Sequence, residues 1–364
     1  MSTPHPSGRR PRGISEAIDP PRSALPRPTR LRLRHVLAST GFLLLVVTVS
    51  VLIGAADLGA TRVLAEILAQ LTGGVSPLSE REAAILWQLR VPRVVLACLV
   101  GAALGGAGAA FQGVFRNPLA DPYLLGAAAG AGLGATIALT LVPATAGWVV
   151  GPVQLAAFVG ALTGVGLAWV LGRSSGPGAG TLVLAGVAVA AFLTAAQTLV
   201  QQLHTEDLRL IYTWMLGGVN TTGWRDVVLV LPYVLVCSVV LCACGRLLDL
   251  LGVGDEEAGS LGVRPGRIRL VVLIAASLAT AAAVSAAGLI GFVGLVVPHL
   301  VRLGVASSYR VVVPLSLLGG AAFLAAADVV ARTVIAPAEL PIGVITAFAG
   351  APFFAFVLRM RGRA

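Results

Sequence analysis

Apolar runs of about 20 residues recur along almost the whole chain, and they restrict its fold more than any other feature. Coiled as an α-helix, a run of this length crosses the roughly 30 Å hydrocarbon layer of a bilayer. In lipid, only helices and closed barrels satisfy their backbone polar groups, and the ten-residue alternating segments of a barrel are not visible. The composition agrees, since 57% of the residues are hydrophobic and 12% are charged. The sequence therefore predicts an all-α polytopic membrane protein.

Ten of these runs are predicted to be transmembrane helices, and together they form one domain over residues 36–360. The preceding residues 1–35 are rich in Arg, Pro and Ser and lack apolar periodicity, which predicts a disordered cytoplasmic tail. Residues 57–93 carry several charges and are expected to form an outer surface segment with short helices. The predicted spans are 36–56, 94–114, 123–142, 148–171, 181–203, 227–244, 268–287, 289–303, 311–330 and 342–358.

The arginines predict the orientation of the chain. All 26 basic residues are arginine. With the N-terminus inside and ten spans, 19 arginines fall on the inner side and seven on the outer side, as the positive-inside rule favours. Both termini are therefore expected to be cytoplasmic. A nucleic-acid partner is not expected from the net charge of +10, because eight arginines lie in the first 34 residues and the others at helix ends.

Two residue types limit the chemistry of this chain. A standard P-loop needs a lysine to reach the β- and γ-phosphates, and the chain contains no lysine. If ATP and Mg²⁺ are used, we expect them to bind a separate polypeptide, so this chain holds no cofactor. The four cysteines lie in apolar runs without CxxC spacing, which indicates inert buried thiols and no metal site. No catalytic residue is predicted.

Two segments on the predicted cytoplasmic face are candidate functional sites. The first is a tight turn between two spans, in which prolines end and start helices and an aspartate can cap the next helix. The second is the longest inner loop, about residues 249–267, which is expected to form one or two short helices that a cytoplasmic partner pushes on; a merely solvated loop is the alternative. The turn residues are Arg116, Asn117, Pro118, Asp121 and Pro122, and the loop residues are Asp255, Glu256, Glu257, Ala258, Gly259, Ser260, Leu261, Gly262 and Val263.

Three arginines lie at span edges on the predicted outer side, where the positive-inside rule disfavours them: Arg90, Arg93 and Arg332. A guanidinium pairs with carboxylates in forked geometry, so these arginines are interpreted as a dock for an acidic surface of an extracytoplasmic protein. The alternative is local pairing, for example between Asp328 and Arg332 one helical turn apart.

Glycines at four-residue spacing, such as Gly101/Gly105 and Gly130/Gly134, predict close helix packing. Asp328 is the only clear acidic residue within a span. An ion-coupled secondary transporter, which needs several intramembrane ionisable groups, is therefore a weaker alternative. A membrane-embedded enzyme would need clustered His and Asp residues, and the four histidines are scattered.

Six motifs in a fixed order resemble the FecCD-type permease subunits of binding-protein-dependent ABC importers, and the resemblance covers residues 36–360. The motifs are LRVPRVV (89–95), GAALGGAGAAFQGVFRNPLADPYLLG (101–126), YTWMLGGVNTTGW (212–224), EEAGSLGV (256–263), GLIGFVGLVVPHLVR (288–302) and ADVVARTVIAPAELPIGVITAFAGAPFFAFVLRM (327–360).

This resemblance implies a ten-span permease in the cytoplasmic membrane of a prokaryote, surrounded by membrane lipid. It implies a second permease copy or a homologous permease, two ATPase subunits and an extracytoplasmic substrate-binding protein as partners. The ATPase contact would fall around Asp255–Val263, and Arg90, Arg93 and Arg332 would correspond to the family's outer docking arginines. An iron–siderophore complex is the implied substrate, with haem and cobalamin as alternatives. The long basic tail departs from the family pattern.

Overall fold

A computed structural model of the chain describes residues 30–54, 56–142, 150–176, 178–219 and 223–361. These segments are helices joined by turns, with no β-strand among them, which confirms the all-α class. The predicted tail lies outside the described residues as far as residue 29, and the first helix starts at Leu33.

Among the described residues, seven helices are long and apolar enough to cross a membrane, and three shorter helices are also apolar. Each predicted span overlaps one of these ten helices, so the expected multi-pass architecture is confirmed. The ten are α1 (Leu33–Leu52), α4 (Val91–Phe115), α5 (Ala127–Leu141), α6 (Pro152–Ser174), α7 (Ala179–Leu203), α9 (Trp224–Val253), α11 (Pro265–Ala287), α12 (Val293–Gly304), α13 (Tyr309–Thr333) and α14 (Ile342–Arg361).

Several predicted boundaries are wrong. Helix α9 continues to Val253, so the first residues of the predicted inner loop, 249–253, belong to this helix. Helix α12 begins at Val293 and not at residue 289, because Gly288 and Phe292 both have positive φ and interrupt the helical backbone. The predicted start of the fourth span, residue 148, lies outside the described residues.

The segment between the first two spans is largely helical. It contains α2 (Ala60–Thr72) and α3 (Glu80–Ala84), which agree with the short helices predicted for this segment. A capping box formed by Ser79 and Glu82 starts α3, which runs through the π-helical turn η1 (Ile85–Arg90) directly into α4. Residues 85–93 are therefore part of a long helix and not of a surface segment.

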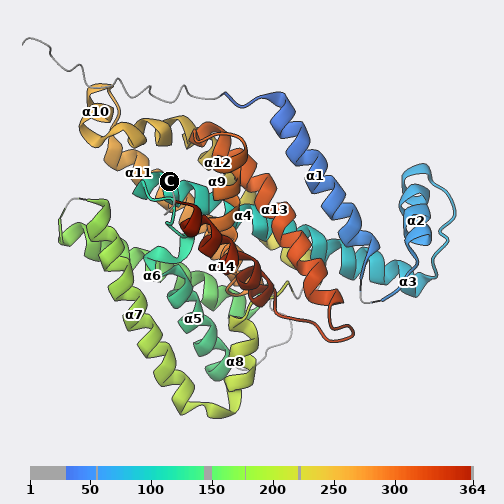
Figure 1. The fold of residues 1–364 in the computed structure, drawn as a ribbon. Helices are drawn as coiled ribbons and strands as arrows, with labels where there is room; N and C mark the ends of the chain where they lie inside the picture. The colour runs from blue at the N-terminus through green and yellow to red at the C-terminus, as the bar shows by residue number, and fades with distance from the viewer. Residues whose placement is uncertain (1–29, 55, 143–149, 177, 220–222, 362–364) are drawn as a thin grey trace, which may run out of the picture.

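Helix α4 lies at the centre of the bundle and packs against α9, α11, α12 and α13 (Figure 1). Its small residues let α13 approach closely. A Cβ on Gly101 would lie 2.2 Å from the carbonyl oxygen of Gly320, and one on Gly105 would lie 2.3 Å from that of Ser316. On the other side of the bundle, Gly130 of α5 faces α6 in the same way. The predicted small-residue packing is confirmed.

The bundle of helices has two ends (Figure 1). The first, called the α10 end, holds the start of α1, the short helix α10 (Asp255–Ser260) and the end of α14. The second, called the α2 end, holds α2, α3 and the start of α9, whose Trp224 donates a hydrogen bond to the carbonyl of Trp87. Both predicted cytoplasmic segments lie at the α10 end, and all three predicted docking arginines lie at the α2 end.

Candidate functional site

Asp255 connects the two segments that the sequence singles out at the α10 end. Its carboxylate accepts two hydrogen bonds from Arg269 of α11, each 2.8 Å long, and it also pairs with Arg116 of the turn. The hydrogen bonds from Arg269 are the main reason why the pKa of Asp255 is lowered below its ordinary value. The carboxylate is therefore charged at neutral pH, and it ties α10 to both α4 and α11.

The rest of the predicted loop packs on the core at two residues and is otherwise exposed. Ala258 is fully buried, and its carbonyl accepts a hydrogen bond from the backbone of Val263, which packs on the core. Gly254 and Gly262 have positive φ and turn the chain at either side of α10. The exposed surface that remains consists of Glu256, Glu257, Gly259, Ser260, Leu261 and Gly262. We call it the α10 surface.

The turn that precedes α5 is built as the sequence predicts. Pro122 begins a 3₁₀ helix, η2 (Pro122–Leu125), and the Asp121 carboxylate accepts a hydrogen bond from the backbone N–H of Tyr123. The side chain of Asn117 accepts one from Leu119 within the turn. Tyr123 donates its hydroxyl to the carbonyl of Ile290 at 3.0 Å, which holds the turn against the segment before α12. This hydrogen bond connects the turn to the segment between α11 and α12.

Two polar residues at this end were missed by sequence reasoning. Asp249 of α9 accepts hydrogen bonds of 2.6 Å from the hydroxyl of Ser308 and the backbone of Tyr309, and so caps α13 from another helix. Gln112, fully buried in α4, pairs with Arg302 of α12. For Gln112, the sequence signal was a polar glutamine inside an apolar run, which indicates a buried hydrogen-bonding role.

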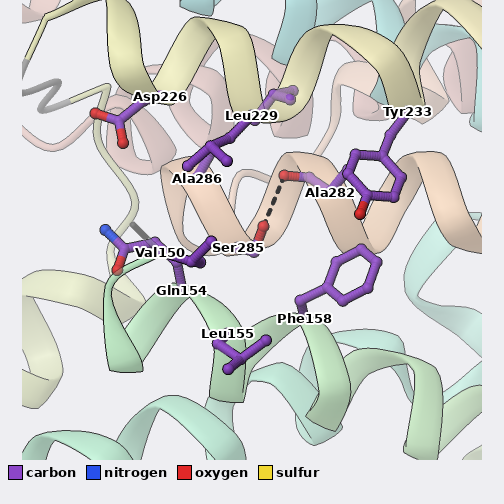
Figure 2. A pocket seen from close by; sticks show the side chains of 11 residues that line it. Val150, Gln154, Leu155, Phe158, Asp226, Leu229, Tyr233, Ala282, Ser285 and Ala286 are labelled. Atoms are coloured by element: carbon purple, nitrogen blue, oxygen red, sulfur yellow. Dashed lines mark hydrogen bonds between the residues drawn. The ribbon is translucent and has the colours of Figure 1, made fainter. Parts of the chain in front are cut away.

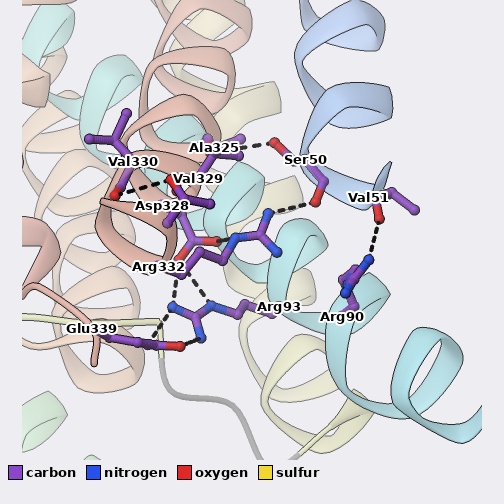
Figure 3. A network of polar contacts seen from close by, with 11 residues as sticks. Ser50, Val51, Arg90, Arg93, Ala325, Asp328, Val329, Val330, Arg332 and Glu339 are labelled. Atoms are coloured by element: carbon purple, nitrogen blue, oxygen red, sulfur yellow. Dashed lines mark hydrogen bonds and ion pairs between the residues drawn. The ribbon is translucent and has the colours of Figure 1, made fainter. Parts of the chain in front are cut away.

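At the α2 end, Arg93 joins α4 to α13 (Figure 3). It donates to one oxygen of Asp328 at 2.8 and 2.9 Å, and to both oxygens of Glu339 at 2.9 Å. The Asp328 carboxylate is 1% exposed, whereas the Arg93 and Glu339 side chains are 17% and 37% exposed. Arg93 therefore links a buried carboxylate to an accessible one.

The other two arginines of this group are buried. Arg332, 3% exposed, lies 3.3 Å from Asp328 and donates to the carbonyl of Ser50 in α1. Arg90, 5% exposed, donates to the carbonyl of Val51 at 3.1 Å. The three arginines do lie at one end of the molecule, as predicted, but the alternative of local Asp328–Arg332 pairing is also present. Docking by these residues stays a prediction.

A cavity of about 150 Å³ lies between α6, α9 and α11 (Figure 2). Phe158, Leu229 and Ala286 give it a mainly apolar lining, to which Asp226 and Ser285 add polar groups. It is smaller than the roughly 300–1,000 Å³ of pockets that hold small-molecule ligands. A larger apolar groove of about 540 Å³ lies on the surface of α14, next to α8 (Leu208–Met215), and is lined by Met215, Leu289, Val344, Ala347, Phe348 and Pro352.

No group of three or more His, Cys, Asp or Glu residues that could hold a metal ion occurs in the described part of the chain.

Comparison with known proteins identifies the family. A model of the FecCD transport family matches residues 42–360. The ABC transporter permease protein YvrB of Bacillus subtilis, itself uncharacterized, is 45% identical, over 75% of this chain and 78% of the relative. The cobalamin import system permease protein BtuC of Halobacterium salinarum is 46% identical, over 76% and 74%. The solved structure of a metal-chelate type ABC transporter, in an inward-facing conformation, has a TM-score of 0.78 and 27% identity, over 90% of this chain and 99% of the other. This chain belongs to the FecCD transport family.

Proposed function

We propose that this ABC importer permease carries an iron–siderophore complex across the cytoplasmic membrane of a prokaryote, driven by ATP hydrolysis on separate ATPase subunits. The metal-chelate type of the structural relative supports an iron chelate as the substrate class. The cobalamin relative makes cobalamin an alternative within the same family. The hemin transport system permease protein HmuU of Yersinia pestis, 38% identical over 76% of this chain, makes haem another. The absence of lysine supports the assignment of the ATPase to another polypeptide.

The observation that carries the proposal is the α10 surface. It presents two carboxylates, Glu256 and Glu257, and an apolar side chain, Leu261, which is 62% exposed. Asp255 fixes this surface to α11 and to the turn after α4. In the proposed mechanism, ATPase subunits bind the α10 surface, and their movement is passed through Asp255 into two helices at once. Coupling between the ATPase and the transport path must run through such a contact.

The transport path is proposed to lie between two permease copies. The 150 Å³ cavity is smaller than the pockets that hold small-molecule ligands, so it is not proposed as the path for a metal chelate. The groove on α14 is large and open on one side, and it is lined by apolar residues and one glycine, Gly343. A second copy, or a homologous permease, facing this groove would close it into a path.

The α2 end is proposed to face outward and to bind the substrate-binding protein through Arg90, Arg93 and Arg332. Arg93 is the most accessible of the three, and its partner Glu339 is more exposed than Asp328. An acidic side chain of the binding protein can therefore replace Glu339 on Arg93. The buried Arg90 and Arg332 then hold α4 and α13 against α1 and add positive potential beneath the contact.

Uptake by cells tests the proposal. Cells would carry this permease with the binding protein and ATPase encoded beside it, and would be offered labelled ferric siderophore, haem or cobalamin. We expect uptake of ferric siderophore that ends when ATP is depleted. Uptake of cobalamin or haem alone would show that the proposed substrate is wrong and that this ligand is carried instead. Uptake that survives ATP depletion but stops with an uncoupler would favour an ion-coupled transporter.

A further inference from the structure

Three arginines from distant parts of the sequence line one pocket at the α10 end. Arg30 precedes α1, Arg246 lies in the last turns of α9, and Arg310 lies in the first turn of α13. The pocket has a volume of about 460 Å³ and is completed by Leu31, Cys242 and Ala243. Cys242 is exposed, so the prediction of a buried thiol is wrong for this residue. All three arginines are exposed, and within the described residues none has an ion pair with a carboxylate. The nearby carboxylate of Asp249 accepts hydrogen bonds from Ser308 and from the backbone of Tyr309. The three guanidiniums of the pocket therefore outnumber this one carboxylate and have no ion-pair partner in the described part of the chain.

The backbone adds to this charge. Helix α1 begins next to the pocket, with Arg32 at its N-cap, no side-chain cap and no acidic residue in its first turn. The free N–H groups at a helix start carry partial positive charge and favour an anion. Within the described chain, an anion at this position would meet both the helix start and the three guanidiniums.

An exposed apolar face leads from the pocket toward the middle of α9. On α9, Val236 and Val239 are 62% and 69% exposed, and they share a face with Ala243 and Arg246 at helical spacing. On α1, Leu33 and Leu37 are 72% and 62% exposed, and they follow the pocket residues Arg30 and Leu31 in the chain. The pocket thus combines a cationic head region with apolar surface for chains, which a soluble anion does not require.

We propose that this pocket binds the phosphate headgroup of an anionic phospholipid, whose acyl chains lie along the exposed faces of α9 and α1. Clusters of basic residues at helix ends attract anionic lipids, with about 1 kcal/mol for each Arg near the membrane surface. The bound lipid bridges the start of α1, the end of α9 and the start of α13. It is a separate site from the α10 surface and does not depend on the transported substrate.

The test uses the full-length chain in detergent and counts bound lipids by native mass spectrometry. Phosphatidylglycerol and phosphatidylcholine with identical acyl chains are titrated, and inorganic phosphate is added as a competitor. We expect tighter binding of phosphatidylglycerol, and an Arg246→Gln/Arg310→Gln variant that binds it about 30-fold more weakly. An Arg246→Lys/Arg310→Lys variant keeps both charges, and its affinity for phosphatidylglycerol is expected to fall far less than that of the glutamine variant.

The control variant Arg173→Gln/Arg359→Gln removes two charges from the same end of the molecule but outside the pocket. It is expected to bind phosphatidylglycerol as the unchanged chain does. Equal losses in both glutamine variants would overturn the proposal, as would displacement of the lipid by inorganic phosphate at equal concentration. If the pocket variant does not fold, equal affinity of the unchanged chain for the two lipids would overturn it.

Discussion

Replacing Asp328 by asparagine removes the negative charge at the centre of the arginine cluster and keeps the size of the side chain. The Asp328 carboxylate is 1% exposed, and it faces Arg93 at 2.8 Å and Arg332 at 3.3 Å. The Arg332 side chain is itself 4% exposed, so the substitution leaves a buried guanidinium without a counter-charge. Loss of one partner from a buried ion pair destabilises proteins by about 3–5 kcal/mol. Because Arg93 keeps Glu339, we expect the lower end of this range, about 3 kcal/mol.

Unfolding of the chain in mixed micelles with increasing denaturing detergent measures this free energy. The matched control is Glu339→Gln, which removes one carboxylate from the same arginine. Because the Glu339 side chain is 37% exposed, its ion pair with Arg93 is expected to contribute about 0–1 kcal/mol. If Asp328→Asn costs no more than Glu339→Gln, the carboxylate is not the buried centre of the cluster and the reasoning is refuted.

Three further predictions concern packing, pH and coupling. Gly130→Ala is expected to destabilise the chain by about 1–3 kcal/mol, because the new Cβ would lie 2.1 Å from a carbonyl oxygen of α6. Gly166→Ala has nothing within 4 Å and is expected to be neutral or to stabilise α6, and equal losses of unfolding free energy would contradict this. Burial raises the pKa of Asp121 from 3.8 to about 6. Since the folded state then holds its proton more tightly, stability falls as pH rises through 6, by about 1 kcal/mol between pH 5 and 7. Asp121→Asn is expected to lack this loss, and parallel pH profiles of unfolding would disprove it. Charge reversal of Glu256 and Glu257 is expected to abolish uptake while ATP hydrolysis by the partner subunits continues, and unchanged uptake would remove the coupling role.

Much of the fold could be predicted from the sequence because the length of an apolar run determines whether a helix crosses the bilayer. The ends of the helices could not be predicted in this way, because a helix can continue beyond the hydrocarbon layer into residues that are not apolar. Helix α9 extends to Val253 for this reason, and the early start of α3 depends on a capping box that hydropathy does not detect. The late start of α12 depends on the positive φ of Phe292. This conformation could not be predicted from the sequence, because residues other than glycine rarely adopt it.

The candidate site was predictable in its residue types and not in its contacts. Arg116 and Asp255 were both singled out, but they are 139 residues apart and nothing in the sequence pairs them. Arg93 and Asp328 are 235 residues apart, so the outer arginines were interpreted without their main internal partner. Local pairing of Asp328 with Arg332 was foreseeable, because residues four apart lie on one helix face.

Transport into proteoliposomes tests the central claim most directly. The permease would be reconstituted with its ATPase subunits, with ATP inside or outside the vesicles and labelled ferric siderophore, loaded on the binding protein, on the opposite side. The account predicts accumulation of the chelate only when ATP and Mg²⁺ reach the ATPase subunits, and none when these subunits are omitted. Accumulation without ATP, driven by an imposed ion gradient, would contradict it.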